Sequence, residues 1–324
     1  MKRFILKILL ILGAPLTFIS AVWLKFIKSK VIEGGSVSDK ILMSVGMLPV
    51  IEHYYEPMIN PKKHLKKSLR DDRDLPGINL NTLCQLDILN KFCYQNELLS
   101  FPFDKCAHNE YYYNNEWYST GDSEYLYSLV RYLKPKQIFE IGSGLSTLMV
   151  RNAVAKNQTE EPDYNCRHIC IEPYECGWLE ELENVEIIRK KVEDVEIAFF
   201  KELQSGDVLF IDSSHVIRPQ GDVLYEFLEI LPNLSAGVIV HIHDIFTPKD
   251  YIDGWVYRHS FWNEQYLLEA FLSNNDNWEI IGATNYLAYN HKELFSEKFP
   301  LFARKTGYKN LVGEPRAFWI RKIK

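Results

Sequence analysis

The sequence predicts an α/β fold with a doubly wound, mostly parallel sheet of seven strands. Five short apolar runs each end in polar residues, and the first run leads through a turn with two glycines into a helical segment. The carboxyl ends of parallel strands lie along one edge of a sheet, so these polar residues are expected to line one crevice. With 324 residues and 47% hydrophobic content, the chain is long enough for one such domain and an appendage.

The N-terminal segment is the appendage. Ile8–Leu24 carries no charged side chain, and as a helix it would extend roughly 26 Å, close to the thickness of a hydrocarbon core. We predict a membrane-anchor helix within residues 1–30; a cleaved signal peptide or a helix lying in the membrane surface are the alternatives. Residues 31–78 are predicted to form a linker or helical extension, and residues 79–324 the main domain.

Helices are predicted between and around the strands. One begins at Asn79 and buries apolar residues spaced three apart, and another is capped by Asp122 or Ser123. A third begins near Asn263, and Ala288–Glu314 is predicted to be a helical excursion. The side chains expected to be buried on these helices are Leu83, Leu86, Leu89, Phe92, Tyr125, Leu126, Leu129, Val130, Leu267, Leu268, Phe271 and Leu272.

The first strand and its turn lie in QIFEIGSGLST, residues 137–147. The strand ends at Glu140, and a helix begins at about Ser146. Glycines let the backbone approach a ligand closely, and the N–H groups of the following helix point to the same place. The turn residues expected to contact a nucleotide cofactor are Gly142, Ser143, Gly144 and Ser146.

Two features of this turn indicate which cofactor it binds. A dinucleotide fingerprint has a third glycine three residues after the second, where this chain has Thr147. The carboxylate of Glu140 would repel a pyrophosphate, but it could accept from the cationic amino-acid head group of S-adenosylmethionine, which has no phosphate. The alternatives are a Rossmann-type NAD-dependent oxidoreductase, a sugar-nucleotide enzyme, or a turn with only a structural role.

The next two strands are followed by acids that could bind the ribose and the adenine of the cofactor. Strand Ile169–Ile171 is followed by Glu172, which can accept from two ribose hydroxyls. Strand Val185–Ile188 leads to Asp194, a candidate acceptor for the adenine amino group.

The fourth and fifth strands end in acids and histidines. Val208–Ile211 is followed by Asp212 and His215, and Val238–Ile242 by His243 and Asp244. A carboxylate that ends a buried apolar strand is costly unless it binds something, so Asp212 is a strong site candidate. His241 and His243 face the same side of their strand, and we expect the first to pack in the core and the second to reach the site.

The order EIGSG, IEP, VED, FIDSSH and HIHD resembles class I S-adenosylmethionine-dependent methyltransferases, of the methyltransferase 24 type, over roughly residues 79–322. The resemblance implies the class I methyltransferase fold, with a last antiparallel strand at Arg316–Ile320 beside a strand at Trp278–Ala283. It implies S-adenosyl-L-methionine as the cofactor, with Tyr118, Gly121 or Asp122 near its methionine end.

Methyl transfer to oxygen requires an aligned acceptor whose hydroxyl proton is removed. A histidine base at His215 or His243 could do this. In the catechol-type O-methyltransferases, acids after strands four and five instead hold magnesium. Asp212 matches the first of these positions, and His243 and Asp244 fall on the pair; the histidine would shift preference toward manganese, iron or zinc. Both possibilities remain open.

Charge and composition limit the partners. A net charge of -6 with no long basic run argues against nucleic acid. The six cysteines form no C-x-x-C pair. We therefore predict O-methylation of a small-molecule or glycan-like acceptor by a membrane-anchored enzyme, with the catalytic domain in the cytoplasm, where S-adenosylmethionine is made. A non-catalytic membrane scaffold is a further alternative.

Overall fold

The computed structural model describes residues 2–30, 36–107, 109–174, 176–304 and 313–324. The chain divides into two compact units, Met1–Lys67 with Val256–Phe261, and Ser68–Trp255 with Trp262–Lys324. The second unit therefore begins before the domain boundary predicted at residue 79. Arg73 shows why: its backbone N–H donates to the carbonyl of Pro248 at 3.1 Å, and its Nη1 binds Glu269 at 2.9 Å.

The predicted single anchor helix is instead two helices, α1 (Lys2–Leu12) and α2 (Ala14–Lys30), which are bent by 56° at the break between them. Gly13 lies at the break and Pro15 follows, and both residues disfavour a continuous helix. Among the described residues, no single helix has the length and apolar content to cross a membrane, although the bent pair taken together does. The extension that follows holds α3 (Val37–Ser44) and α4 (Pro61–His64).

The second unit is built on a seven-stranded sheet with the order β3-β2-β1-β4-β5-β7-β6. All neighbouring strands are parallel except β7, which runs antiparallel between β5 and β6. The predicted doubly wound sheet with an antiparallel last strand is confirmed. The strands are β1 (Gln137–Ile141), β2 (Arg167–Ile171), β3 (Val185–Ile188), β4 (Val208–Ile211), β5 (Ile239–Ile242), β6 (Trp278–Ala283) and β7 (Phe318–Lys322).

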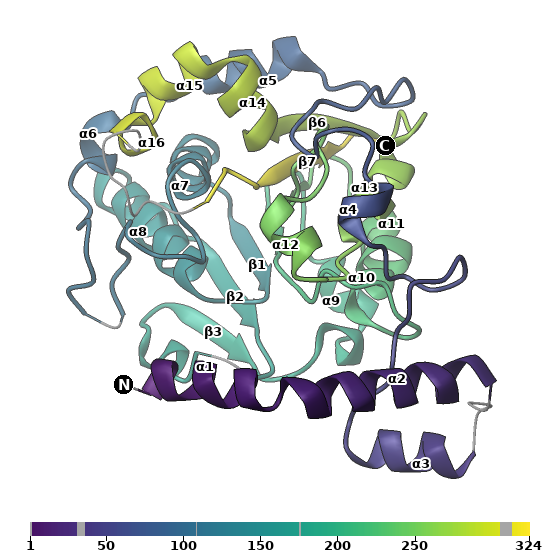
Figure 1. Ribbon diagram of the computed structural model, residues 1–324. Helices are drawn as coiled ribbons and strands as arrows, with labels where there is room; N and C mark the ends of the chain where they lie inside the picture. The colour runs from purple at the N-terminus through teal and green to yellow at the C-terminus, as the bar shows by residue number, and fades with distance from the viewer. Residues whose placement is uncertain (1, 31–35, 108, 175, 305–312) are drawn as a thin grey trace. The chain divides into compact units, whose positions relative to one another are not determined.

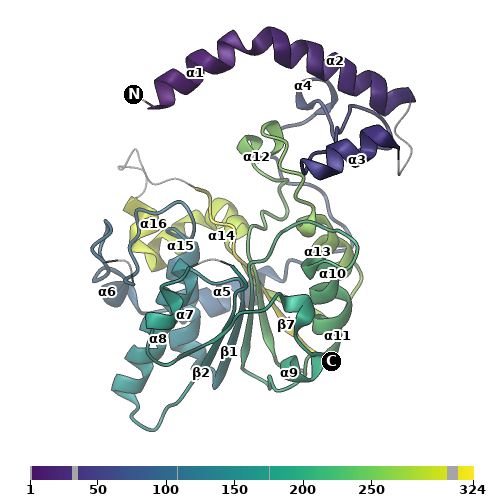
Figure 2. The ribbon, with the colours of Figure 1, turned by 90° about the horizontal axis from the view of Figure 1, so that it is seen from below.

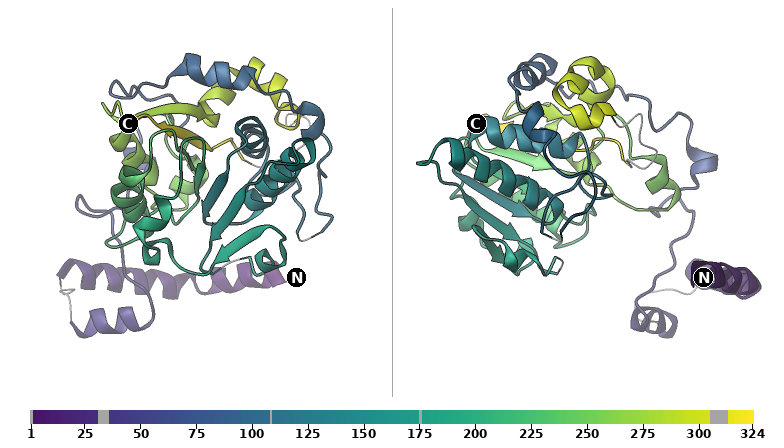
Figure 3. Two further views of the ribbon diagram at one scale, coloured as in Figure 1. Left: turned by 180° about the vertical axis from the view of Figure 1, so that it is seen from behind. Right: turned by 90° about the vertical axis from the view of Figure 1, so that its left-hand side faces the viewer.

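Helices cover both faces of this sheet (Figures 1 and 2). Alternate residues of each strand enter two separate cores: Ile138 packs in the core on one face, and Phe139 in the core on the other. Figure 3 shows the same layers from two further sides. The first face carries α5 (Thr82–Asn90), α6 (Gln95–Leu98), α7 (Asp122–Leu133), α8 (Leu145–Glu160), α14 (Thr284–Asn290), α15 (Lys292–Lys298) and α16 (Pro300–Arg304), and the second carries α9 (Ile197–Phe200), α10 (Asp222–Tyr225), α11 (Leu231–Asn233) and α13 (Glu264–Leu272). A π-helical turn, Glu226–Ile230, joins α10 to α11, and α12 (Asp253–Tyr257) precedes α13.

Most predicted element positions are confirmed, and the last strand is shifted. It begins at Phe318 instead of Arg316, because the carboxylate of Asp122 accepts the backbone N–H groups of Arg316 and Ala317 at 2.9 Å. Those two groups are therefore not available to pair with a neighbouring strand.

The helices agree with the prediction in different degrees. α13 begins where expected. α7 begins at Asp122, so its N-cap is Gly121 and the predicted cap at Asp122 or Ser123 is wrong, but Tyr125, Leu126, Leu129 and Val130 are buried as predicted. α5 begins at Thr82, three residues after the predicted start, and Leu83 is 84% exposed, so it does not belong to the buried face. The excursion predicted at Ala288–Glu314 contains α15, α16 and the last three residues of α14, and its residues 305–312 lie outside the described part.

Candidate functional site

The glycine turn lies where three strands end together. Gly142 donates its N–H to the carbonyl of Ile171 at 3.0 Å, and Asp212 donates its N–H to the carbonyl of Ile141 at 2.8 Å. The φ of Gly142 is 78°, and a Cβ at this position would lie 1.9 Å from the carbonyl oxygen of Asp212. Only glycine fits there, and it brings the turn directly against the end of β4.

Thr147 explains why the turn has no third glycine. The Thr147 hydroxyl accepts the N–H of Gly144 at 3.1 Å and donates to Oε2 of Glu140 at 2.7 Å. A glycine in place of Thr147 would leave both groups without this partner. The Thr147 hydroxyl, in the first turn of α8, therefore links the glycine turn to the end of β1.

Glu140 supports the turn from behind. Its carboxylate is fully buried, and Oε1 lies 2.6 Å from Nε2 of His168. Cys170 completes a trio of side chains that could in principle ligate a metal. However, two ligands at about 2.0 to 2.2 Å from one ion lie roughly 3 Å or more apart, so the Glu140–His168 contact is a hydrogen-bonded pair. Direct contact between Glu140 and a cofactor head group stays a prediction, and in this structure the carboxylate faces the core.

His168→Gln is expected to remove a pH-dependent part of the stability. Burial alone would lower the pKa of His168, but the charges of Cys170 and Glu140 raise it from 6.5 to about 10. The folded protein thus holds this proton more tightly than the unfolded chain, so the stabilisation is complete below pH 6.5 and is lost as the pH rises toward 10. Wild-type protein should lose up to about 1.4 kcal/mol of unfolding free energy per pH unit in this window. Urea denaturation across the window measures the slope; equal slopes in the two proteins would contradict the assignment.

Glu172 lies beside the turn. Its Oε2 accepts the N–H of Ser143 at 3.2 Å, and its Oε1 accepts the N–H of Tyr174 at 2.9 Å. Ser146 is buried in the first turn of α8. The structure thus brings Glu172, Ser143 and the two glycines together, as a ribose-binding role requires, although their contact with a cofactor stays a prediction.

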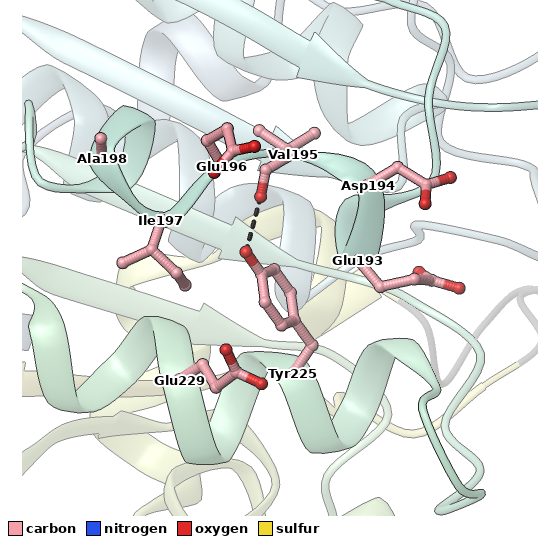
Figure 4. A pocket seen from close by; sticks show the side chains of 8 residues that line it. All are labelled: Glu193, Asp194, Val195, Glu196, Ile197, Ala198, Tyr225 and Glu229. Carbon is pink, nitrogen blue, oxygen red and sulfur yellow. Dashed lines mark hydrogen bonds between the residues drawn. The ribbon is translucent and has the colours of Figure 1, made fainter.

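Asp194 lines a pocket of about 330 Å³ (Figure 4). The Tyr225 hydroxyl donates to the carbonyl of Val195 at 2.6 Å across this pocket. Burial, followed by the charges of Glu229 and Glu196, raises the pKa of Tyr225. The pocket is lined by Glu193, Asp194, Val195, Glu196, Ile197, Ala198, Tyr225 and Glu229. A contact between Asp194 and an adenine amino group stays a prediction.

Acids and histidines converge at the ends of β4 and β5. Nε2 of His215 lies 3.3 Å from Oδ1 of Asp212 and 3.2 Å from Oδ2 of Asp244. Nδ1 of His243 lies 3.5 Å from Oδ1 of each of these two aspartates. His215 and Asp244 have φ values of 60° and 58°, a left-handed conformation that is uncommon for such residues and is often found at functional sites. The four predicted residues therefore form one cluster.

Asp122 links this cluster to α7. Its Oδ2 lies 3.6 Å from Nε2 of His243, and its Oδ1 accepts the hydroxyl of Thr284 at 2.7 Å. The Tyr118 ring lies 4.9 Å from the His243 ring. Asp122 and Tyr118 are therefore placed at the acid–histidine end of the crevice, as expected for residues near the methyl donor.

His241 packs in the core, whereas His243 reaches the cluster. The His241 ring stacks on Phe210 with centroids 3.9 Å apart, and its side chain is fully buried. Burial and the charge of His243 lower the pKa of His241 well below its usual range. The neutral His241 is thus distinct from its charged neighbour.

The carboxylates raise the pKa of the clustered histidines. Burial alone would lower the pKa of His215, but contacts with Asp212 and Glu264 raise it well above its usual range. Burial likewise opposes charge on His243, yet Asp212 and Asp244 raise its pKa to about 9. Burial raises the pKa of Asp212, but His243 and His215 outweigh it and hold it well below the ordinary value. The acids therefore favour a positive charge between them, whether it is a ring proton or a bound cation.

The sequence analysis missed three residues of this site. Oε2 of Glu264, in the first turn of α13, lies 2.8 Å from Nδ1 of His215. The Trp262 ring lies 4.8 Å from the His215 ring, and Nε of Arg316 lies 2.5 Å from Oδ1 of Asp244. The one available signal was Glu264, an acid in the first turn of a predicted helix, which helix-end electrostatics also explains.

An open α/β sheet with a glycine turn after β1 and acids at the following strand ends defines a nucleotide-type cofactor crevice. Residues 139–245 match the family described as methyltransferase domain, and this part of the chain is a class I methyltransferase domain.

Two relatives give the range of similarity. A protein of Archaeoglobus fulgidus described as uncharacterized is 28% identical over 195 residues, which is 56% of this chain and 85% of that protein. A crystal structure from Plasmodium falciparum, described as a candidate protein-L-isoaspartate O-methyltransferase in complex with S-adenosyl-L-homocysteine, is 14% identical. That match covers 49% of this chain and 83% of the other, with a TM-score of 0.28, which is too low to support an argument about fold.

Proposed function

We propose that this protein transfers a methyl group from S-adenosyl-L-methionine to an oxygen of a small-molecule or glycan-like acceptor. The observation that carries the proposal is the position of the acid–histidine cluster. Gly142 of the turn packs on the backbone of Asp212, so the turn that would hold the donor is next to the groups that would deprotonate an acceptor. A dinucleotide is disfavoured because Thr147 occupies the position of the third glycine and is bonded to Glu140.

One group of side chains would bind the methyl donor, and another would bind and deprotonate the acceptor. The turn and Glu172 would hold the nucleoside, and Asp194 the adenine. His215 and His243, once they have released a ring proton, are the candidate bases for the acceptor hydroxyl. Asp212, His215 and Asp244 also offer ligand atoms that lie within 4.8 Å of one another, so they fit a divalent metal, which would lower the pKa of a bound hydroxyl.

Calorimetry on the full chain tests the donor. S-adenosylhomocysteine should bind and NAD should not, and the reverse result would overturn the proposal. Glu172→Ala should weaken binding of S-adenosylhomocysteine by about 1 to 3 kcal/mol through lost ribose hydrogen bonds. Glu183→Ala, at an exposed glutamate that follows the same strand β2 in the chain, serves as the control and should leave the affinity unchanged.

The acceptor requires a separate experiment. The purified protein is incubated with methyl-labelled cofactor and fractionated cell extract, and the fraction that gains label is identified. Label in an alkali-stable, oxygen-linked methyl group of a small molecule or glycan supports the proposal. Label only in nucleic acid, or NAD-dependent oxidation without label transfer, contradicts it.

We also propose that the N-terminal unit associates with a membrane, with the catalytic domain at the cytoplasmic side, where S-adenosylmethionine is made. α1 and α2 expose large apolar side chains, among them Leu10 at 66%, Ile11 at 72% and Phe18 at 71%. Lys7 and Lys25 lie on the same two helices and suit an anionic lipid surface. The full chain should therefore float with liposomes that contain anionic lipid.

Leu10→Glu combined with Ile11→Glu should abolish this flotation, because two carboxylates cannot enter the apolar layer without a large desolvation cost. Leu83→Glu, at an exposed leucine of α5, is the matched control and should float like the wild type. Equal flotation of all three proteins would refute the role of α1.

A further inference from the structure

His215 is held at both ends by the start of α13. Its Nδ1 lies 2.8 Å from Oε2 of Glu264. Its carbonyl oxygen accepts the backbone N–H groups of Asn263 and Glu264 at 3.0 and 3.3 Å. Glu264 has no exposed surface, and a buried carboxylate requires a strong partner. The imidazole therefore has one fixed orientation, with Nδ1 directed to Glu264 and Nε2 directed away from it.

The free end of this imidazole points between two acids. Nε2 lies 3.3 Å from Asp212 and 3.2 Å from Asp244, and both distances exceed the 2.8 Å of the Nδ1 contact with Glu264. An N–H shared between two acceptors makes two long bonds, whereas charge-assisted hydrogen bonds are normally about 2.7 to 2.9 Å long. Two ligands at about 2.0 to 2.1 Å from a tetrahedral ion are about 3.3 Å apart. The spacing thus fits a shared cation better than a shared proton.

The second oxygen of Asp244 does not compete for this position. Arg316 binds Oδ1 of Asp244, whereas Oδ2 faces His215. His243 approaches the same two aspartates at 3.5 Å, which is farther than the 3.3 and 3.2 Å of His215. His215 is therefore the better ligand of the two histidines.

We infer that Asp212, His215 and Asp244 hold a divalent transition-metal ion, and that Glu264 is the positioning residue that turns Nε2 of His215 toward it. This inference rests on the proposed function, because it specifies the metal-assisted form of the same site. It replaces His243 of the predicted ligand set with His215. An imidazole with two carboxylates selects manganese, iron, cobalt or zinc over magnesium.

The test uses the full chain after treatment with a chelator, with cobalt(II) chloride alone as the probe. Wild-type protein should show one saturable site and a visible absorption band typical of nitrogen and oxygen ligands. His215→Gln should abolish the band, whereas His243→Gln should keep it. Glu264→Gln, which preserves volume but removes the charge behind the imidazole, should weaken cobalt affinity by about 10- to 100-fold at unchanged stoichiometry.

Glu269→Gln is the matched control. Glu269 lies on the same helix, is also buried, and pairs with Arg73 instead of His215, so its substitution should leave cobalt affinity unchanged. Wild-type protein without a saturable site, or equal affinities for Glu264→Gln and wild type, would overturn the inference. Binding of S-adenosylhomocysteine is measured in the same samples. Cofactor binding without cobalt binding refutes the metal site alone, and cobalt binding without cofactor binding refutes the proposed function alone.

Discussion

Gly142→Ala is expected to destabilise the second unit by about 3 kcal/mol or more and to abolish measurable binding of S-adenosylhomocysteine. Two costs add at this position. The φ of 78° disfavours any side chain, and the new Cβ would lie 1.9 Å from the carbonyl oxygen of Asp212. Because that oxygen belongs to backbone, relief requires the ends of β1 and β4 to separate. The separation would open the crevice exactly between the predicted donor and acceptor sites.

Urea denaturation and calorimetry measure both effects, and Gly144→Ala is the control. Gly144 has an extended φ of 178°, and the nearest atom to an added Cβ is Sγ of Cys176 at 4.0 Å. Its substitution should change the unfolding free energy by less than about 1 kcal/mol. Equal stability losses for the two alanine variants would show that the close approach at Gly142 is not what the turn depends on.

Arg316→Met is expected to destabilise the protein by about 3 kcal/mol, measured by urea denaturation in the presence of a chelator. Arg316 is the guanidinium that pairs with the buried Asp244, and it also donates to the carbonyls of Glu116 and Trp117 at 3.3 and 2.8 Å. Methionine retains much of the side-chain volume but leaves a buried carboxylate without this cation. Arg316→Lys should recover only part of the loss, because lysine lacks the fork that reaches three acceptors.

The double variant Arg316→Met with Asp244→Asn separates charge from packing. If the unpaired carboxylate causes most of the loss, the second substitution should restore about 1 to 2 kcal/mol, since it removes the buried charge. A double variant whose loss equals the sum of the two single losses would show that the pair is not coupled. The carbonyl contacts would then account for the effect of Arg316.

The strand positions could be predicted from the local pattern of apolar and polar residues. Apolar runs of four to six residues that end in polar groups placed β3, β4 and β6 at their observed bounds. The alternation of side chains along β1 also held a signal that the sequence analysis did not use. Glu140 lies on the same face of β1 as Ile138, whose side chain is in a core. Side-chain alternation therefore predicts that the Glu140 carboxylate also faces the core.

The structure shows side-chain contacts between distant parts of the chain that no sequence motif predicts. Glu264 contacts His215 from 49 positions away, and Asp122 delays the start of β7 by accepting the N–H of Arg316 from 194 positions away. The break at Gly13 likewise turns one predicted anchor into two helices, although glycine and proline there were visible in the sequence. Long-range pairing depends on how α7, α13 and β7 pack on the sheet, which local periodicity does not encode.

The sequence by itself determined that a glycine turn and the acids and histidines of four later strand ends would meet along one edge of a parallel sheet, because strand direction and side-chain alternation are local properties. Only the tertiary structure decided which way each of these groups faces. Glu140 lies behind the turn with His168, and His215 is fixed by Glu264 between Asp212 and Asp244. The physical reason is that buried charges take whichever partner the packed elements bring within hydrogen-bonding distance, and those partners come from distant parts of the chain.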